Sequence, residues 1–496
     1  MSSTKYIPII GLEIHVQLST DTKLFCGCPR KISQDIYGTD AAANTAICPI
    51  CMGYPGAMPN LNEKAVEKAV KIGLGLGCSI SKFSVWDRKN YIYPDLFTGY
   101  QISQLDNPIN YTGKIELSNG KVIRVNRAHL ENDAAKSQHS GDSTMLDGNK
   151  SGSPLVEIVS EPDLRSADEA KEYAEKIREI VRWVDATDAD MYRGEMRFDI
   201  NISLCVEGDP DNDFKNIKHT PIVEVKNRNS FKELYDVINY EIKRQTEEYE
   251  KNGKIYNKGN KVTMGWNEAK GATFLQREKE ESDDYRYFHE PDVPPVIVSD
   301  EWLNKIKNSM PQPMSEVIES LVEKYSVDRR TASYLVSDRD KYKLFVKCSE
   351  LDPKYAKNYI NWIASELAGI LSALEKDLTN VNIEAKTLVD LVSLVTEGKI
   401  SQAVGKELLK EFIEKNINPD VLKLIEERSL GKVSDTGFIE EIVKKAIEAN
   451  PKAVEDIKKG KENAKMSIIG YVMRESKGKA DVNVVKEILD KNIELL

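Results

Sequence analysis

Four of the seven cysteines of this chain lie in one short N-terminal stretch, as the pairs Cys26/Cys28 and Cys48/Cys51. Two close pairs separated by a loop are typical of four thiolates that converge on a tetrahedral zinc ion. The alternative is a pair of disulfides or unrelated thiols, but nothing in the sequence looks secreted. The sequence therefore predicts a structural zinc knuckle that fixes a loop early in the first domain.

The length and charge of the chain limit its class. A chain of 496 residues is too long for one core and predicts two to four domains. The net charge of −10 argues against a surface coated in positive charge, although it leaves room for a local basic face. No apolar run approaches the length of a membrane span, and the N-terminus lacks the pattern of a signal peptide. We therefore expect a cytoplasmic protein with no membrane partner.

The character of the sequence changes along the chain. Strict alternation predicts a strand over 9–18, and the turn at 118–120 predicts a hairpin over 111–125. Capping boxes at Ser166 and Ser230 predict two helices. Beyond the prolines of 291–313 the sequence is helical, with a break at 416–419. We predict an α+β fold: a β-sheet-rich N-terminal cradle domain with the zinc knuckle (1–295), a helical domain (296–415) and a helical tail (416–496).

Polar residues recur on one face of several predicted strands. Alternation places Glu13 and His15 on the face opposite Leu12 and Ile14, and a carboxylate beside an imidazole can bind a divalent ion. A solvated polar face is the alternative, but this strand runs directly into the cysteine loop. Asp199 with Asn201, and Glu224 with Lys226, share strand faces in the same way. These residues would form a basin if their strands belong to one sheet, which the sequence does not show.

Other segments suggest or exclude particular chemistry. The stretches 87–95 and 283–292 are rich in tyrosine and arginine, which stack on bases or pack at a domain seam. The chain has no P-loop, no Gly-x-Gly-x-x-Gly after a strand, no amidase serine-glycine stretch and no Gly-x-Ser-x-Gly elbow. Any use of ATP would therefore need a nonstandard site.

Taken together, the stretches 11–18, 87–91, 93–95, 100–104, 151–163 and 284–288 resemble the B subunits of the aspartyl/glutamyl-tRNA amidotransferases, in the GatB/GatE family. The stretches 463–465 and 477–480 resemble the helical tail that this family shares with YqeY-like proteins. The resemblance covers essentially the whole chain in order. The archaeal E subunits carry an inserted domain, for which this chain leaves no room.

The resemblance implies a ligase that forms carbon–nitrogen bonds with glutamine as amido donor. Such a protein uses ATP and Mg²⁺ to phosphorylate the side-chain carboxylate of Glu-tRNA(Gln) or Asp-tRNA(Asn). Ammonia then displaces the phosphate. The ammonia comes from a glutaminase A subunit, and a small C subunit completes a heterotrimer. A zinc-stapled RNA-binding or scaffold protein without catalysis is the alternative.

The resemblance also implies roles for individual residues. Magnesium would be held by Glu13, His15, Glu131 and Asp199, with Glu224 in the same basin. Lys89 would meet phosphate or the substrate carboxylate, beside Arg88 at the cofactor. Where the family usually has Glu-Glu-Asp this chain has Asn132 as the middle residue, and the charges over 192–199 are rearranged. A basic tail would hold tRNA, through Lys458, Lys459, Lys461, Lys465, Arg474, Lys477 and Lys479, unless it is only a solvated helical face.

Overall fold

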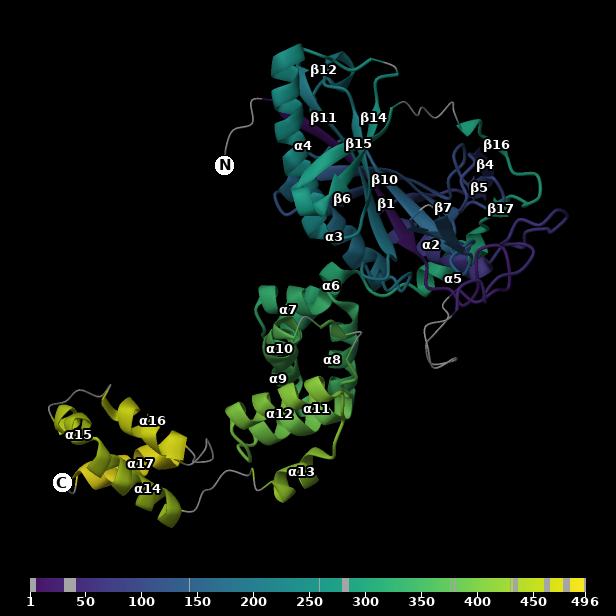
Figure 1. Cartoon of the computed structure of the whole chain (residues 1–496). Helices are drawn as coiled ribbons and strands as arrows, with labels where there is room; N and C mark the ends of the chain where they lie inside the picture. The colour runs from purple at the N-terminus through teal and green to yellow at the C-terminus, as the bar shows by residue number, and fades with distance from the viewer. Residues whose placement is uncertain are drawn as a thin grey trace. The chain divides into compact units, whose positions relative to one another are not determined.

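The computed structural model describes residues 6–30, 42–141, 143–257, 259–278, 285–374, 376–378, 381–428, 430, 436–458, 464–475 and 482–494. Its contacts divide the chain into two compact units, Met1–Pro311 and Gln312–Leu496 (Figure 1). The first unit carries the β-sheets and the second is helical, as the sequence predicts. The finer division of the helical part at residue 416 stays a prediction.

A ten-stranded sheet forms the centre of the first unit, in the order β15-β14-β13-β11-β1-β10-β7-β6-β2, with β12 paired to β11. Its strands are β1 Ile7–Gln17, β2 Ser79–Ile80, β6 Asn110–Glu116, β7 Val122–Asn132, β10 Pro154–Ser160, β11 Met196–Glu207, β12 Lys218–His219, β13 Val223–Arg228, β14 Val262–Asn267 and β15 Ala272–Glu278. β13 and β14 pair in parallel, and every other pair in this sheet is antiparallel. The predicted strand at 9–18 is thus β1, and the predicted hairpin is β6–β7.

One face of this sheet is apolar and packs against helices α2 Glu63–Gly75, α3 Ala167–Trp183 and α4 Phe231–Asn252 (Figure 1). The alternation of β1 sends Leu12, Ile14 and Val16 into this core. Both predicted N-caps are confirmed, because Ser166 and Ser230 accept hydrogen bonds from backbone N–H groups at the starts of α3 and α4. The glutamate of each predicted box accepts from the N–H of the residue before the cap. The helices close one side of the sheet and leave its polar face on the other.

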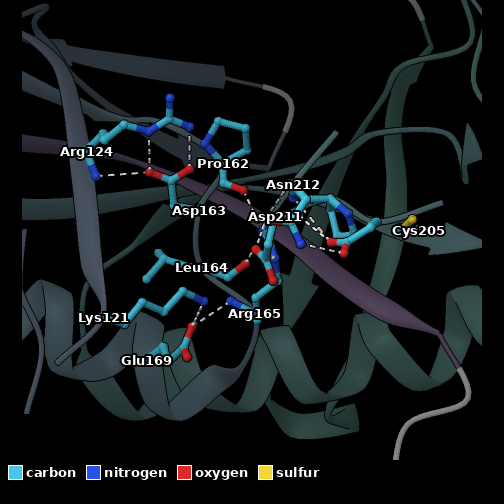
Figure 2. Close-up of polar contacts among 12 residues, drawn as sticks. Lys121, Arg124, Pro162, Asp163, Leu164, Arg165, Glu169, Cys205, Asp211 and Asn212 are labelled. Atoms are coloured by element: carbon cyan, nitrogen blue, oxygen red, sulfur yellow. Dashed lines mark hydrogen bonds and ion pairs between the residues drawn. The ribbon is translucent and has the colours of Figure 1, made fainter. Parts of the chain in front are cut away.

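Ion pairs fix the turn that joins β10 to α3 (Figure 2). Arg124 in β7 binds Asp163 with two hydrogen bonds, Nε to Oδ2 at 2.9 Å and Nη2 to Oδ1 at 2.6 Å. Glu169, in the first turn of α3, accepts from Lys121 Nζ and from the backbone N–H of Arg165, both at 2.8 Å. A carboxylate in the first turn also favours the helix start electrostatically. The contacts therefore fix the point at which the chain leaves β10 and enters α3.

Three small sheets accompany the large one, and two of them join segments that are far apart in the sequence. β4 Asp87–Asn90 pairs with β5 Tyr100–Ser103 and with β16 Phe288–His289, which brings the two tyrosine-rich stretches together. β3 Phe83–Ser84 pairs with β17 Val296–Ile297, and β8 Lys136–Ser140 with β9 Ser143–Asp147. The short helices η1 Phe214–Asn216 and η2 Glu268–Lys270, and helix α5 Asp300–Asn308, complete the unit.

The second unit is helical throughout its described residues. It contains α6 Met314–Tyr325, α7 Arg329–Val336, α8 Arg339–Leu351, η4 Pro353–Tyr355, α9 Ala356–Asn361, η5 Trp362–Leu367, α10 Ala368–Ala373, α11 Ala385–Thr396, α12 Gln402–Lys415, α13 Val421–Glu427, α14 Thr436–Ala449, α15 Pro451–Lys458, α16 Lys465–Glu475 and α17 Val482–Glu494. Apolar residues of α14, α16 and α17 share one core. None of the described helices is long and apolar enough to cross a bilayer.

Candidate active site and metal centres

The polar face of the large sheet carries a cluster of acidic residues. We call it the polar basin and define it by Glu13, His15, Glu131, Glu157, Asp199 and Glu224. Strand register brings these residues together, because cross-strand pairs on one face lie side by side. The pairs are Glu13 with Asp199, His15 with Glu157, and Asn201 with Glu224. The strands predicted to share a basin thus do belong to one sheet.

The first half of the basin consists of His15, Glu131 and Glu157. His15 Nε2 lies 3.4 Å from Glu157 and 3.7 Å from Glu131. Burial lowers the pKa of His15, but the hydrogen bond and charge of Glu157 outweigh burial and raise the pKa to about 9. Burial and the charge of Glu157 raise the pKa of Glu131 to about 7. The three ligand atoms lie within 4.8 Å of one another, a spacing that suits one divalent ion.

The second half consists of Glu13, Asp199 and Glu224, whose ligand atoms also lie within 4.8 Å of one another. Asn201 Nδ2 donates to Glu13 Oε1 at 3.0 Å. Burial, with the neighbouring carboxylates, raises the pKa of Glu13 to about 6. Lys226 Nζ lies 3.1 Å from Glu224 and 4.0 Å from Asp199. The carboxylates therefore repel one another, and Lys226, with Lys261 at 3.6 Å from Glu224, offsets part of the repulsion.

Lys89 enters the basin from β4, outside the large sheet. Its Nζ lies 4.9 Å from the ring centre of Tyr285 and 5.8 Å from that of Tyr91. Although burial lowers it, the pKa of Lys89 is raised overall by Tyr287, Glu157 and nearby acidic groups. Lys89 is thus a fixed cation beside the carboxylates, held by the two tyrosine-rich stretches.

Arg88, the neighbour of Lys89, makes different contacts. Its guanidinium binds Glu290 at 2.6 and 2.9 Å and Asp292 at 3.0 Å, and it stacks 4.2 Å from the ring centre of Tyr100. These partners tie β4 to the segment after β16. A role of Arg88 at the cofactor stays a prediction, and its observed contacts are those of a structural ion pair.

The residue at 132 does not face the basin. Asn132 Oδ1 accepts a hydrogen bond from the backbone N–H of Ile102 at 2.7 Å, on the side away from Glu131. Asp133, the next residue, binds Lys150 at 2.8 Å and Arg197 at 3.2 Å. The asparagine therefore joins β7 to β5, and the chain loses no basin ligand at this position.

Glu157 is the basin residue that sequence reasoning missed. Its face-sharing neighbours on β10 are Leu155 and Val159, so no polar alternation marks this strand. Lys150 lies in a turn without alternation, and Arg197 shares the polar face of β11 with Asp199, but only the fold shows that both contact Asp133. Only the register of β10 against β1 reveals that Glu157 lies beside His15.

The four N-terminal cysteines form a separate cluster. The sulfur atoms of Cys26, Cys28, Cys48 and Cys51 lie within 4.8 Å of one another, and none forms a disulfide. A hydrogen bond from Cys26 is the main cause that lowers the pKa of Cys51 to about 4. Four converging sulfurs match a closed structural zinc site.

The predicted basic tail falls mostly outside what the structure describes. Lys459, Lys461, Lys477 and Lys479 lie outside the described residues, and the side chain of Lys458 is not described either. Lys465 Nζ pairs with Asp490 at 2.9 Å, and Arg474 lies 5.5 Å from the ring centre of Tyr471. The role of this tail stays a prediction.

Comparison with known proteins covers both units. Residues 8–304 match the family described as GatB/GatE catalytic domain, and residues 343–493 match the family described as GatB domain. The chain is 41% identical over 499 residues to the B subunit of the aspartyl/glutamyl-tRNA(Asn/Gln) amidotransferase of Thermotoga maritima, with 99% of each chain covered. It is 42% identical over 494 residues to the corresponding protein of Elusimicrobium minutum, covering 98% of this chain and 99% of the relative. Because these matches run through the polar basin, the cysteine cluster and the helical unit alike, the chain belongs to the GatB/GatE family.

Proposed function

We propose that this chain is the component of a glutamine-dependent tRNA amidotransferase that activates the misacylated amino acid. The substrate is Glu-tRNA(Gln), Asp-tRNA(Asn) or both, as the names of the relatives suggest. The single observation that carries the proposal is the polar basin: two neighbouring acidic groups on one sheet face, with Lys89 and Lys226 beside them.

The chemistry explains why such a basin is needed. A carboxylate is inert to ammonia until one of its oxygens becomes a good leaving group. A carboxylate oxygen of the substrate attacks the γ-phosphorus of ATP, and ADP leaves. Ammonia then attacks the activated carbonyl carbon, the C–O bond to phosphate breaks, and the nitrogen loses a proton. Two negatively charged partners meet in the first step, so catalysis depends on positive charge placed between them.

Magnesium fits the basin on the chemistry of its donors. Carboxylate oxygens are the protein ligands that Mg²⁺ favours. The raised pKa values of Glu13, about 6, and Glu131, about 7, mark carboxylates that lack enough compensating charge. Glu131 and Glu157 would hold one ion, with His15 as a ligand once its proton has left, and Glu13, Asp199 and Glu224 would hold a second. When bound, Mg²⁺ neutralises charge on the phosphates and orients them for attack.

The residues of the chain supply the rest of the site. Lys89, held by Tyr91 and Tyr285, would bind the γ-phosphate or the substrate carboxylate. Lys226 pairs with Asp199 and Glu224 and keeps the two carboxylates aligned. Asn201 orients Glu13 through its amide hydrogen bond. These contacts hold the donors in place before substrate arrives.

Partners provide what the chain lacks. The sequence has no amidase signature, so ammonia would come from a separate glutaminase A subunit, and a small C subunit would complete a cytoplasmic heterotrimer. The cysteine cluster would bind a structural zinc ion. The helical tail after residue 416 would bind tRNA, and its deletion is expected to weaken tRNA affinity.

The test replaces Glu13 or His15 with alanine in the assembled enzyme. Transfer of ammonia to mischarged tRNA should be abolished, while glutaminase activity of the partner remains measurable. Glu116→Ala, at an exposed carboxylate on β6 of the same sheet, is the matched control and should leave activity unchanged. If transamidation survives both basin changes, the proposed site is wrong. Absence of ATP consumption with mischarged tRNA would instead support a non-catalytic RNA-binding or scaffold protein.

A further inference from the structure

Lys23 is a fully buried lysine beside the cysteine cluster, with a side chain that is 0% exposed. Its Nζ contacts the carbonyl oxygen of Ala46 at 2.8 Å, that of Gly148 at 3.2 Å, and Cys51 Sγ at 3.5 Å. Lysine is almost never fully buried unless it is paired with an opposite charge. The position of this side chain therefore needs an electrostatic explanation.

Carboxylates do not supply that explanation. Among the described residues, no aspartate or glutamate forms an ion pair with Lys23. Two carbonyl oxygens offer partial charges only, and the remaining contact is the sulfur of Cys51. A cysteine that coordinates a metal ion is a thiolate. Four thiolates around Zn²⁺ leave an excess of two negative charges, so a metal-loaded cluster provides the charge that a buried ammonium requires.

The same side chain reaches the loop that leads into the basin. Gly148 begins this loop, and Gly152 near its end has a positive φ of +81°. A Cβ at Gly152 would lie 3.4 Å from the Cβ of Cys51 and 3.6 Å from the Cδ of Lys23, so the three residues pack closely. Ser151 Oγ donates to the carbonyl oxygen of Cys51 at 2.9 Å. β10, with Glu157, follows directly.

We propose that Lys23 is a positioning residue that offsets the negative charge of the metal–thiolate centre and fixes the 148–152 loop against it. The inference rests on the proposed zinc site. Loss of the metal would release the four sulfurs from one fixed centre, and the loop before Glu157 would lose its anchor. The cysteine cluster would thus influence the polar basin without taking part in chemistry.

The experiment measures zinc affinity of the full chain by competition with a chromophoric chelator. Lys23→Met should weaken zinc binding about 10- to 100-fold, the range seen when residues that contact metal ligands are changed. Lys23→Arg keeps the charge and should recover most of this affinity. Lys68→Met is the matched control, because Lys68 Nζ binds the neutral Ser19 Oγ at 3.0 Å and the carbonyl oxygen of Asp185. It should bind zinc as the wild type does.

The outcomes separate the two levels of the proposal. A wild-type chain that binds no zinc overturns the zinc site itself. A wild-type chain that binds zinc, with Lys23→Met equal to it within about twofold, overturns the role of Lys23 alone. If Lys23→Met does not fold, Lys23→Gln takes its place. Chelation should also lower the melting temperature of the wild type more than that of the variant, and an equal decrease in both would contradict the inference.

Discussion

The cysteine cluster and the polar basin are both candidate metal centres, but they are built in opposite ways. The cluster takes its four sulfurs from turns within one N-terminal stretch, and these sulfurs can fill a tetrahedral shell. The basin takes its oxygens from β1, β7, β10, β11 and β13, and burial with mutual repulsion raises the pKa of two of its carboxylates, Glu13 and Glu131. The first arrangement stabilises a fold when metal binds. The second arrangement leaves negative charge without full compensation in the folded protein, and a substrate complex can interact with this charge.

From this contrast we expect the largest loss of stability when a residue of the cysteine cluster is replaced. Cys51→Ser removes one thiolate ligand, so the chain should lose metal and unfold more easily, by about 5 kcal/mol or more, because the free energy of metal binding is part of the free energy of folding. Denaturant unfolding with and without a chelator checks this. Cys205→Ser, at a buried cysteine outside the cluster, is the control. Equal zinc content in wild type and Cys51→Ser would contradict the prediction.

A substitution in the polar basin should instead act mainly on the rate of transamidation and less on stability. Glu157→Gln keeps the shape of the side chain and removes a charge beside His15, so transamidation should fall about 100- to 1,000-fold, as when a preorganised charge is lost. The free energy of unfolding should fall by about 3 kcal/mol, less than at the cysteine cluster, because His15 loses its nearer carboxylate partner but keeps Glu131 at 3.7 Å. Steady-state rates and denaturant unfolding on the same sample test both halves. A large loss of stability with little loss of rate would make Glu157 a structural residue.

Arg88 and Lys89 are adjacent on β4, and we expect a structural role for Arg88 and a catalytic role for Lys89. Arg88→Ala would leave the side chain of Glu290, which is 0% exposed, without its guanidinium partner, and should cost about 3 kcal/mol of stability. The KM for ATP should change by less than about threefold in the folded variant. Lys89→Ala should instead abolish transamidation. If Arg88→Ala raises the KM for ATP and leaves stability intact, the predicted role of Arg88 at the cofactor is correct.

The smallest expected effect is a pH dependence of stability caused by His129, a residue of β7 that is 3% exposed. Burial lowers its pKa from 6.5 to about 4, so the folded protein holds the neutral imidazole and protonation favours the unfolded chain. The contribution of His129 to the free energy of unfolding is complete above pH 6.5 and is lost as the pH falls towards 4. The loss at pH 5 is about 2 kcal/mol. His129→Gln should reduce this loss of stability in chelator-treated protein. An unchanged slope between pH 7 and pH 5 would contradict the assignment.

Local patterns predicted several parts of this molecule well. The capping serines Ser166 and Ser230 start helices, the hairpin turn falls between β6 and β7, and Glu13 and His15 share one face of β1. The position of Asn132 was ambiguous from its neighbours. It became clear only from the hydrogen bond that Ile102 donates to it from β5. Glu157 gave no signal, because the residues around it on β10 are apolar on both faces.

The cysteine cluster and the helical unit could be predicted from the sequence, because cysteine spacing and helical periodicity act over a few residues. Which carboxylates meet depends on the three-dimensional fold. Antiparallel register places His15 beside Glu157 and Glu13 beside Asp199, across separations of 142 to 186 residues. A shift of register by one residue would turn those side chains to the opposite face. The register is held by the apolar face of the same strands against α2, α3 and α4, so the packing of the core fixes the chemistry of the basin.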